Sequence, residues 1–242
     1  MLLNPPLTLT RPQVLAYRRK VQALDDRLPT GPDSLRRAAW AGLQDSMPRA
    51  AVLSIHARVD GTGPGAWEDP SLVQLWGPRF QVYVVARRDL ALFSLGRFPD
   101  DDKSRGIYED LATRLHAFLG GRTMTYGEAG YGLGEHPNRL RYAATTGTVL
   151  IRWAGARAPT IWTVPAPGIQ PREARLELAR RYLHVFGPAT AESFAKWAGI
   201  GRSEARRAFE ALGGSMLPVR TPIGDCWILA SDEPVSFAPM PL

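Results

Sequence analysis

Residues 171–212 read PREARLELARRYLHVFGPATAESFAKWAGIGRSEARRAFEAL, and this stretch decides the fold. Its apolar residues recur at helical intervals in three runs, which Gly187-Pro188 and Gly199 separate. Because glycine and proline end helices, the pattern predicts three amphipathic helices. The period then shortens to that of two strands, at Met216–Arg220 and Cys226–Leu229. Three helices followed by a β-hairpin predict a winged helix-turn-helix.

The middle of the chain repeats this order of elements less sharply. Residues 103–119, 125–131 and 138–146 have the apolar spacing of helices. Residues 149–153 and 160–164 are rich in β-branched and aromatic side chains and flank a short turn, so they read as the strands of a hairpin. This stretch therefore predicts a second unit of the same kind.

The front of the chain follows the same order again. Thr10 and Gln13 form a capping-box pattern at the start of one helix. Further helices are predicted at residues 33–43 and 48–59, and residues 80–86 alternate as a strand. In this unit the helix at 48–59 takes the place of the third helix.

We therefore predict an α+β fold of three tandem winged helix-turn-helix units, mainly helical with small β-hairpin wings. The units are expected at residues 1–100, 101–167 and 168–242. The proline- and glycine-rich stretch 164–171 is the linker before the last unit.

Composition points to a polyanionic partner. The 242 residues carry 30 Lys and Arg against 23 Asp and Glu, a formal net charge of +7. One cysteine excludes an internal disulfide and a cysteine-based zinc site, and four scattered histidines suggest no metal, so we expect no cofactor. No stretch is long and apolar enough to span a membrane, and the start of the chain lacks a signal peptide, so a cytoplasmic protein is expected.

The stretch AGLQDSMPRAAVLSIHARV, residues 41–59, places Gln44, Asp45 and Ser46 just before the predicted third helix of the first unit. A structural interpretation is that Ser46 is the N-cap, that Asp45 complements the helix dipole, and that Pro48 occupies the first turn. On residue types alone this interpretation is favoured over chemistry, because polar turn residues are common and catalytic ones are rare.

Four stretches carry a resemblance to a known family: residues 41–59, WEDPSLVQLWGPRF at 67–80, RYAATTGTVLIRW at 141–153, and RRYLHVFGPATAESFAKWAGIGRSEARRAFEAL at 180–212. Together they resemble the bacterial tandem winged-helix proteins that include the AlkZ/YcaQ-like DNA glycosylases, which unhook alkylated purines and interstrand crosslinks. The resemblance covers the chain from about Leu7 to Leu229. Family members usually continue into a small C-terminal β-domain, and the resemblance implies that this chain, ending at Phe237–Leu242, stops before it.

The resemblance also implies catalytic residues. The family signature is Gln-x-Gln in the first unit; Gln44 matches its first glutamine, whereas Ser46 stands at the second. A purine alkylated at N7 is already a good leaving group, so a neutral amide that positions a water suffices. Gln44 would hold that water, Ser46 would offer a shorter second contact, and Asp45 would supply charge. The departure at Ser46 leaves DNA binding better supported than catalysis.

Eight arginines are candidates for contact with the DNA backbone, because they lie off the apolar faces of predicted third helices or at the start of a strand. They are Arg49, Arg58, Arg79, Arg139, Arg141, Arg202, Arg206 and Arg207. Each is alternatively a solvated charge. Helical spacing would let Glu204 pair with Arg207, and Arg206 with Glu210.

The leading hypothesis is a DNA-binding protein, and if an enzyme a monofunctional DNA glycosylase that hydrolyses the N-glycosidic bond of alkylated purines in DNA repair. Its partner would be double-stranded DNA, damaged or crosslinked, in the nucleoid. The oligomeric state is left open, with a monomer favoured. The alternative is a non-catalytic DNA-binding protein, a regulator or damage-site binder. A protein-interaction module stays open, because fold alone does not settle function. The lesion and any preferred DNA sequence are left open.

Overall fold

The computed structural model describes residues 7–47, 49–155 and 157–233. Expectations about residues 1–6, Pro48 and the chain end at 237–242 lie outside the described residues. The α-helices are α1 (Arg11–Val21), α2 (Pro32–Ala38), α3 (Ala50–His56), α4 (Leu90–Leu95), α5 (Asp102–Leu119), α6 (Tyr126–Gly132), α7 (Leu140–Ala143), α8 (Pro171–Phe186), α9 (Ala191–Ala198) and α10 (Arg202–Leu212). The strands are β1 (Leu7–Thr8), β2 (Leu43–Gln44), β3 (Leu72–Trp76), β4 (Val82–Ala86), β5 (Met124–Thr125), β6 (Val149–Arg152), β7 (Thr160–Thr163), β8 (Met216–Thr221) and β9 (Gly224–Leu229).

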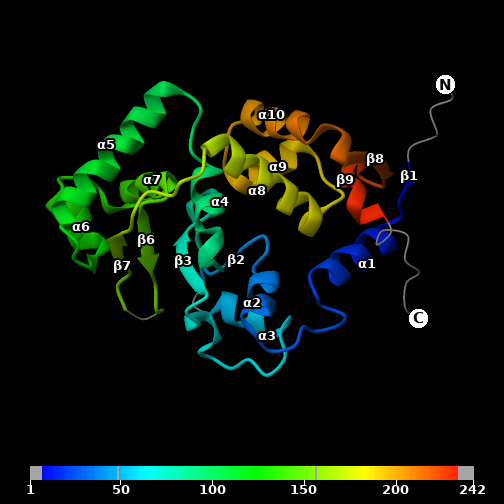
Figure 1. Cartoon of the computed structure of the whole chain (residues 1–242), viewed down its shortest axis with the longest axis horizontal. Coiled ribbons are helices and arrows are strands. Elements are labelled where there is room, and N and C mark those ends of the chain that lie inside the picture. The colour runs from blue at the N-terminus through cyan, green and yellow to red at the C-terminus, as the bar shows by residue number, and fades with distance from the viewer. Residues whose placement is uncertain (1–6, 48, 156, 234–242) are drawn as a thin grey trace.

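The elements form three lobes, each with its own small sheet (Figure 1). The first lobe holds α2, α3 and the sheet β2-β4-β3, and the second holds α5–α7 and the sheet β5-β7-β6. The third lobe holds α8–α10 and the sheet β1-β8-β9. The chain is therefore an α+β protein, as predicted. No helix of the described residues is long and apolar enough to cross a membrane.

The third lobe agrees closely with the sequence. The N–H of Ser193 is capped by the Thr190 side chain at the start of α9, and Gly199 ends that helix in the left-handed conformation. Gly201 precedes α10, and β8 and β9 form the antiparallel hairpin. Strong local start and stop signals fix these elements, because capping groups satisfy the unpaired N–H groups of a helix end.

The second lobe keeps the predicted order, with one difference. Helices α5 and α6 and the hairpin β6-β7 match their predicted ranges within one or two residues. The predicted helix at 138–146 is instead a 3-10 turn, the short helix α7 and a second 3-10 turn.

The first lobe departs most from the sequence prediction. The helix expected at 33–43 ends at Ala38, and the chain then turns into β2 at Gly42, which has a positive φ of 72°. The sequence pattern does not identify strands β2 and β3. All five residues of β3 are buried, so the strand lacks the alternation that marks a half-exposed strand.

Residues 7–21, expected in the first unit, lie against the third lobe. Strand β1 pairs in parallel with β8, and Leu9 packs with Val219 and Ile228 in a small apolar cluster. Tyr17 of α1 donates a hydrogen bond of 2.6 Å to the carbonyl of His184 in α8. Apolar periodicity identifies α1 as a helix, but it does not show against which lobe the helix packs, because that depends on tertiary packing.

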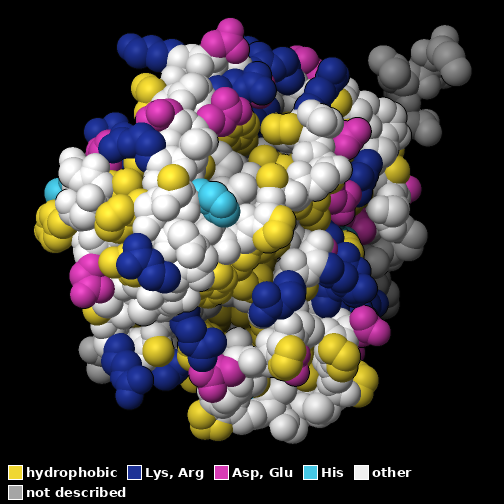
Figure 2. All heavy atoms as spheres, turned by 60° about the vertical axis from the view of Figure 1, so that its left-hand side comes forward, with side chains coloured by type: hydrophobic (Ala, Val, Ile, Leu, Met, Phe, Trp, Pro, Cys, Tyr) yellow, Lys and Arg dark blue, Asp and Glu magenta, His cyan; other side chains and the backbone are white. Residues whose placement is uncertain are grey.

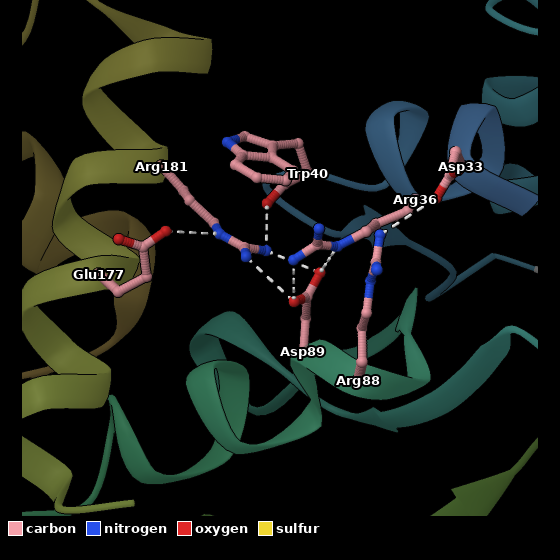
Figure 3. Close-up of polar contacts among 7 residues, drawn as sticks. All are labelled: Asp33, Arg36, Trp40, Arg88, Asp89, Glu177 and Arg181. Carbon is pink, nitrogen blue, oxygen red and sulfur yellow. Dashed lines mark hydrogen bonds and ion pairs between the residues drawn. The ribbon is translucent and has the colours of Figure 1, made fainter.

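A charged cluster joins the first and third lobes. Asp89, at the start of α4, receives hydrogen bonds from Arg36 of α2 at 2.9 and 3.0 Å and from Arg181 of α8 at 3.0 Å (Figure 3). The guanidinium of Arg181 also lies 4.0 Å from the ring centroid of Trp40. Asp89 and Arg181 are buried, so this ion pair is part of the core.

Candidate active site

Gln44 lies on the edge strand β2, which pairs with β4 through Leu43 opposite Val84 and Gln44 opposite Tyr83. Successive side chains of extended backbone point to opposite faces. Leu43 and Asp45 are accordingly buried, whereas Gln44 is exposed and Ser46 is half-buried. The three polar residues are thus divided between two faces.

Gln44 and Ser46 are joined by a hydrogen bond beside Arg79. The Nη2 of Arg79 donates to Oε1 of Gln44 at 3.1 Å, and Nε2 of Gln44 donates to Oγ of Ser46 at 2.7 Å. A guanidinium can only donate, so Arg79 fixes which way the amide of Gln44 faces. The Ser46 hydroxyl keeps its own hydrogen to donate, and Oε1 of Gln44 keeps a second lone pair. These two groups could together orient a water molecule.

Asp45 faces the interior. Its Oδ1 accepts the N–H of Ala51 at 3.0 Å, and its Oδ2 accepts from Nε2 of Gln74 at 2.7 Å. Burial raises the pKa of Asp45, against the hydrogen bonds from Ala51 and Gln74 and the charge of Arg49. Both carboxylate oxygens are therefore engaged away from the Gln44–Ser46 pair.

The predicted N-cap at Ser46 is wrong. Helix α3 begins at Ala50, and the N-cap position is Arg49, which has a positive φ of 72° and makes no side-chain cap. Asp45 instead accepts the N–H of Ala51 in the first turn, as a capping carboxylate does. The helix therefore begins later than expected, and its carboxylate partner is Asp45, which was expected to complement the helix dipole, and not Ser46.

Gln44 opens on a pocket of about 260 Å³ between the first and third lobes. We call it the arginine pocket, after Arg37, Arg58 and Arg79, which line it. Arg58 is held by the carbonyl of Ser54 at 2.9 Å and by Gln22 at 2.8 Å, and burial lowers its pKa. Apolar and aromatic walls complete the pocket, among them Trp40, Tyr83, Phe186 and Trp197.

The other predicted arginines lie outside this pocket. Two of them lie over aromatic rings: the guanidinium of Arg49 is 5.0 Å from the ring centroid of Trp67, and that of Arg141 is 5.7 Å from that of Phe80. Three form ion pairs, with nitrogen–oxygen distances of 3.0 Å for Arg139 and Glu135, 3.1 Å for Arg202 and Glu192, and 2.5 Å for Arg207 and Asp100. Arg206 is exposed on α10. Glu204 accepts the backbone N–H groups of Gly201 and Asp100. The expected Glu204–Arg207 pairing is thus replaced by Asp100–Arg207.

Several pocket residues were not predicted. Arg37 comes from α2, Trp40 from the turn after it, Gln22 from the end of α1, and Tyr83 from β4. The adjacent pair Arg36-Arg37 was the available signal. Neighbouring side chains on a helix point in different directions, so when Arg36 contacts Asp89, Arg37 points elsewhere and can line the pocket. On the face shown in Figure 2, Lys and Arg side chains lie on both sides of a hollow with hydrophobic side chains at its floor.

The described residues include no group of three or more His, Cys, Asp and Glu side chains placed to hold a metal ion. Gln44, hydrogen-bonded to Ser46, instead lines a pocket together with three arginines, an arrangement that could orient water next to a polyanion.

Comparisons with known proteins bear on this site. The model of the AlkZ-like DNA glycosylase family matches residues 37–242, which include Gln44 and Ser46. Among solved structures, DNA glycosylase AlkZ of Streptomyces sahachiroi is similar over 97% of this chain and 74% of that chain, with a TM-score of 0.77 and 18% sequence identity. At that identity the likeness concerns the fold. No curated protein sequence matches significantly. Because the family model covers most of its length, the chain belongs to the AlkZ-like DNA glycosylase family.

Proposed function

We propose that the protein is a monofunctional DNA glycosylase that hydrolyses the N-glycosidic bond of an alkylated purine in duplex DNA, without a cofactor. One observation carries the proposal: in a chain of this family, the exposed Gln44, which is hydrogen-bonded to Ser46, lines a pocket together with three arginines. Guanidinium groups suit the phosphates that flank a target nucleotide.

The proposed reaction needs little from the protein. The bond between C1′ and the base nitrogen breaks, the alkylated purine leaves with the bonding electrons, and its positive charge is neutralised by them. Water supplies the oxygen that bonds to C1′ and loses a proton to solvent. Oε1 of Gln44 accepts a hydrogen bond from that water and places its negative dipole near the developing oxocarbenium charge. The hydroxyl of Ser46 provides the second contact.

For Asp45 we propose a positioning role. Its carboxylate accepts hydrogen bonds from Ala51 at the start of α3 and from Gln74 of β3, and so holds the backbone between Gln44 and Ser46 in place. The positions of Gln44 and Ser46 therefore depend on a buried group that does not reach the proposed water. A misplacement of about 1 Å can cost about a hundredfold in rate.

We also propose that the three lobes are tandem winged-helix units within residues 1–100, 101–167 and 168–242, with residues 7–21 acting as an arm against the third. Duplex DNA would contact the arginines of all three units, and the protein would act as a monomer on DNA in the cytoplasmic nucleoid. The third-helix position of α10 supports contact by Arg202, Arg206 and Arg207.

Affinity for duplex DNA should fall steeply as salt rises, because each bound phosphate releases counterions. Replacing Arg202, Arg206 and Arg207 together with alanine should make the fall of log affinity with log salt less steep. The magnitude of the slope should decrease by about 1 for each phosphate that is no longer bound, equally for all DNA sequences. Fluorescence anisotropy at several salt concentrations measures both quantities. Arg180→Ala is the control, because Arg180 is an exposed arginine on α8, outside the third helix of its lobe. An unchanged slope in the triple variant would contradict DNA binding by α10.

Ser46→Gln should release base faster than the parent protein, because it restores the family's Gln-x-Gln spacing and extends the second contact by about two bonds. The free energy of unfolding should change by less than about 0.5 kcal/mol, since Ser46 does not cap α3. The assay is single-turnover release from a duplex that contains N7-methylguanine. Ser46→Ala is the matched variant and should be slower than the parent. Equal rates in all three proteins would exclude Ser46 from the reaction.

The serine at position 46 also favours the second candidate, a non-catalytic binder of damaged DNA, because its hydroxyl is shorter than the family's glutamine amide. The same assay separates the two. Selective binding of the lesion duplex without release by parent or Ser46→Gln would support the binder.

A further inference from the structure

A second pocket, of about 260 Å³, lies between the first and second lobes. We call it the aromatic pocket; Ser46, Trp76, Tyr126, Asn138, Arg141 and Trp153 line it. Ser46 lines this pocket and Gln44 lines the arginine pocket, and the two side chains share a hydrogen bond of 2.7 Å. The candidate catalytic pair thus separates two pockets of different chemistry.

Four aromatic side chains line the aromatic pocket: Trp76, Phe80, Tyr126 and Trp153. Trp76 and Tyr126 have ring centroids 6.1 Å apart and planes tilted by 59°, and Trp153 adds a second indole. Aromatic rings attract flat π-systems and cations through their faces. The pocket is smaller than the roughly 300–1,000 Å³ that drug-sized ligands occupy, which suits a ligand as small as one nucleobase.

Polar groups are placed at one side of these rings. The hydroxyl of Tyr126 donates to Oδ1 of Asn138 at 3.0 Å, so the two N–H groups of the Asn138 amide remain to donate. The Nε of Arg141 is buried and has no hydrogen-bond partner among the described residues. A purine alkylated at N7 still presents acceptors such as O6 of guanine, which such donors bind.

We propose that the aromatic pocket receives the base of the target nucleotide. This inference rests on the proposed glycosylase function. The phosphate would lie at the arginine pocket, the sugar at Gln44 and Ser46, and the base against Trp76, Tyr126 and Trp153. A base must leave the duplex stack to reach such a pocket, and aromatic side chains replace the stacking that it loses.

The arginine pocket is an unfavourable binding site for this base. An N7-alkylated purine is cationic, and Arg37, Arg58 and Arg79 would repel it. The aromatic pocket contains one guanidinium, that of Arg141, which lies 5.7 Å from the ring centroid of Phe80 and 5.5 Å from that of Tyr142. Charge therefore separates the two pockets into a phosphate side and a base side.

The test compares two duplexes, one with N7-methylguanine and one with a tetrahydrofuran abasic site in its place. Trp153→Leu removes the ring but keeps the two hydrogen bonds between the backbone of residue 153 and the side-chain amide of Gln74. It should weaken binding of the lesion duplex and slow base release by about 5- to 150-fold, the range expected when one aromatic ring no longer stacks on a base, and leave abasic-duplex binding within about twofold. Trp153→Phe should recover most of both losses. Arg37→Ala should weaken both duplexes alike.

Equal losses on both duplexes in Trp153→Leu would overturn the proposal, because a residue that binds only the DNA backbone does not distinguish them. A lesion-selective loss in Gln22→Ala, with Trp153→Leu unaffected, would overturn it by moving the base to the arginine pocket. If the parent protein releases no base, the proposed glycosylase function is wrong. The aromatic pocket is then still supported if the parent binds the lesion duplex selectively and Trp153→Leu abolishes that selectivity, and it is contradicted if the parent shows no such selectivity or if Trp153→Leu retains it. Equal urea unfolding midpoints for Trp153→Leu and Trp153→Phe show that folding does not explain a difference between them.

Discussion

Base release from an N7-methylguanine duplex should slow about 100- to 1,000-fold in Gln44→Ala, the loss typical when one positioned polar group is removed from a reacting centre. The side chain is exposed, and its hydrogen bonds go to Arg79 and Ser46 at the surface. Its removal therefore leaves the core intact, and the free energy of unfolding should change by less than about 0.5 kcal/mol. Affinity for duplex DNA should stay nearly constant, because the arginines supply it.

Gln170→Ala is the matched control. Gln170 is also an exposed glutamine, at the N-cap position of α8, and its side chain makes no cap hydrogen bond. Single-turnover release and urea unfolding are measured on both variants. Release by Gln44→Ala at the parent rate would remove Gln44 from the mechanism and leave the family signature at this site without a chemical role.

The sequence predicted helices well where local signals are strong. Thr10, Thr125 and Thr190 each cap a helix with a partner three residues on, and all three helices begin where these caps stand. A two-residue strand such as β2 carries no periodicity, and the fully buried β3 carries no alternation. Neither strand is therefore evident from the sequence, although Gln44 lies on β2 and Gln74 of β3 holds the neighbouring Asp45.

The candidate site was only partly predictable for a related reason. Gln44 and Ser46 came from a local motif, whereas the arginine pocket is assembled from α1, α2, α3, α8 and α9. Placement on a third helix or at the start of a strand selected Arg58 and Arg79, which line the pocket. The same rule also selected Arg202, Arg206 and Arg207, which lie outside it, and overlooked Arg37. Which arginines gather around a motif depends on packing between lobes, and no spacing rule describes that packing.

The charged cluster at Asp89 links this packing to the site. Arg36 and Arg181 both contact Asp89, and their guanidinium groups lie 4.9 and 4.0 Å from the ring centroid of Trp40. Trp40 in turn lines the arginine pocket. The wall of that pocket is therefore held by an ion cluster between the first and third lobes.

Asp89→Ala should destabilise the protein by about 3–5 kcal/mol, because it removes the buried carboxylate that Arg36 and Arg181 share and leaves the buried guanidinium of Arg181 with Glu177 as its remaining ion-pair partner among the described residues. Burial opposes ionisation of Asp89, but Arg36 and Arg181 outweigh it and hold the pKa of this carboxyl below its usual value. The stabilisation should therefore be complete above about pH 4, the usual range of an unfolded aspartate, and be lost as pH falls through the lower folded-state pKa. Urea unfolding at several pH values measures both effects.

Asp33→Ala is the matched control in the same region, because the ion pair between Asp33 and Arg88 is exposed (Figure 3). It should cost at most about 1 kcal/mol. If Asp89→Ala were no more destabilising than Asp33→Ala, the buried cluster would not hold the lobes together. If Asp89→Ala loses stability and also slows base release in conditions where it remains folded, while Asp33→Ala does neither, the cluster positions the wall of the arginine pocket through Trp40. Stability and chemistry would then depend on the same contact between lobes.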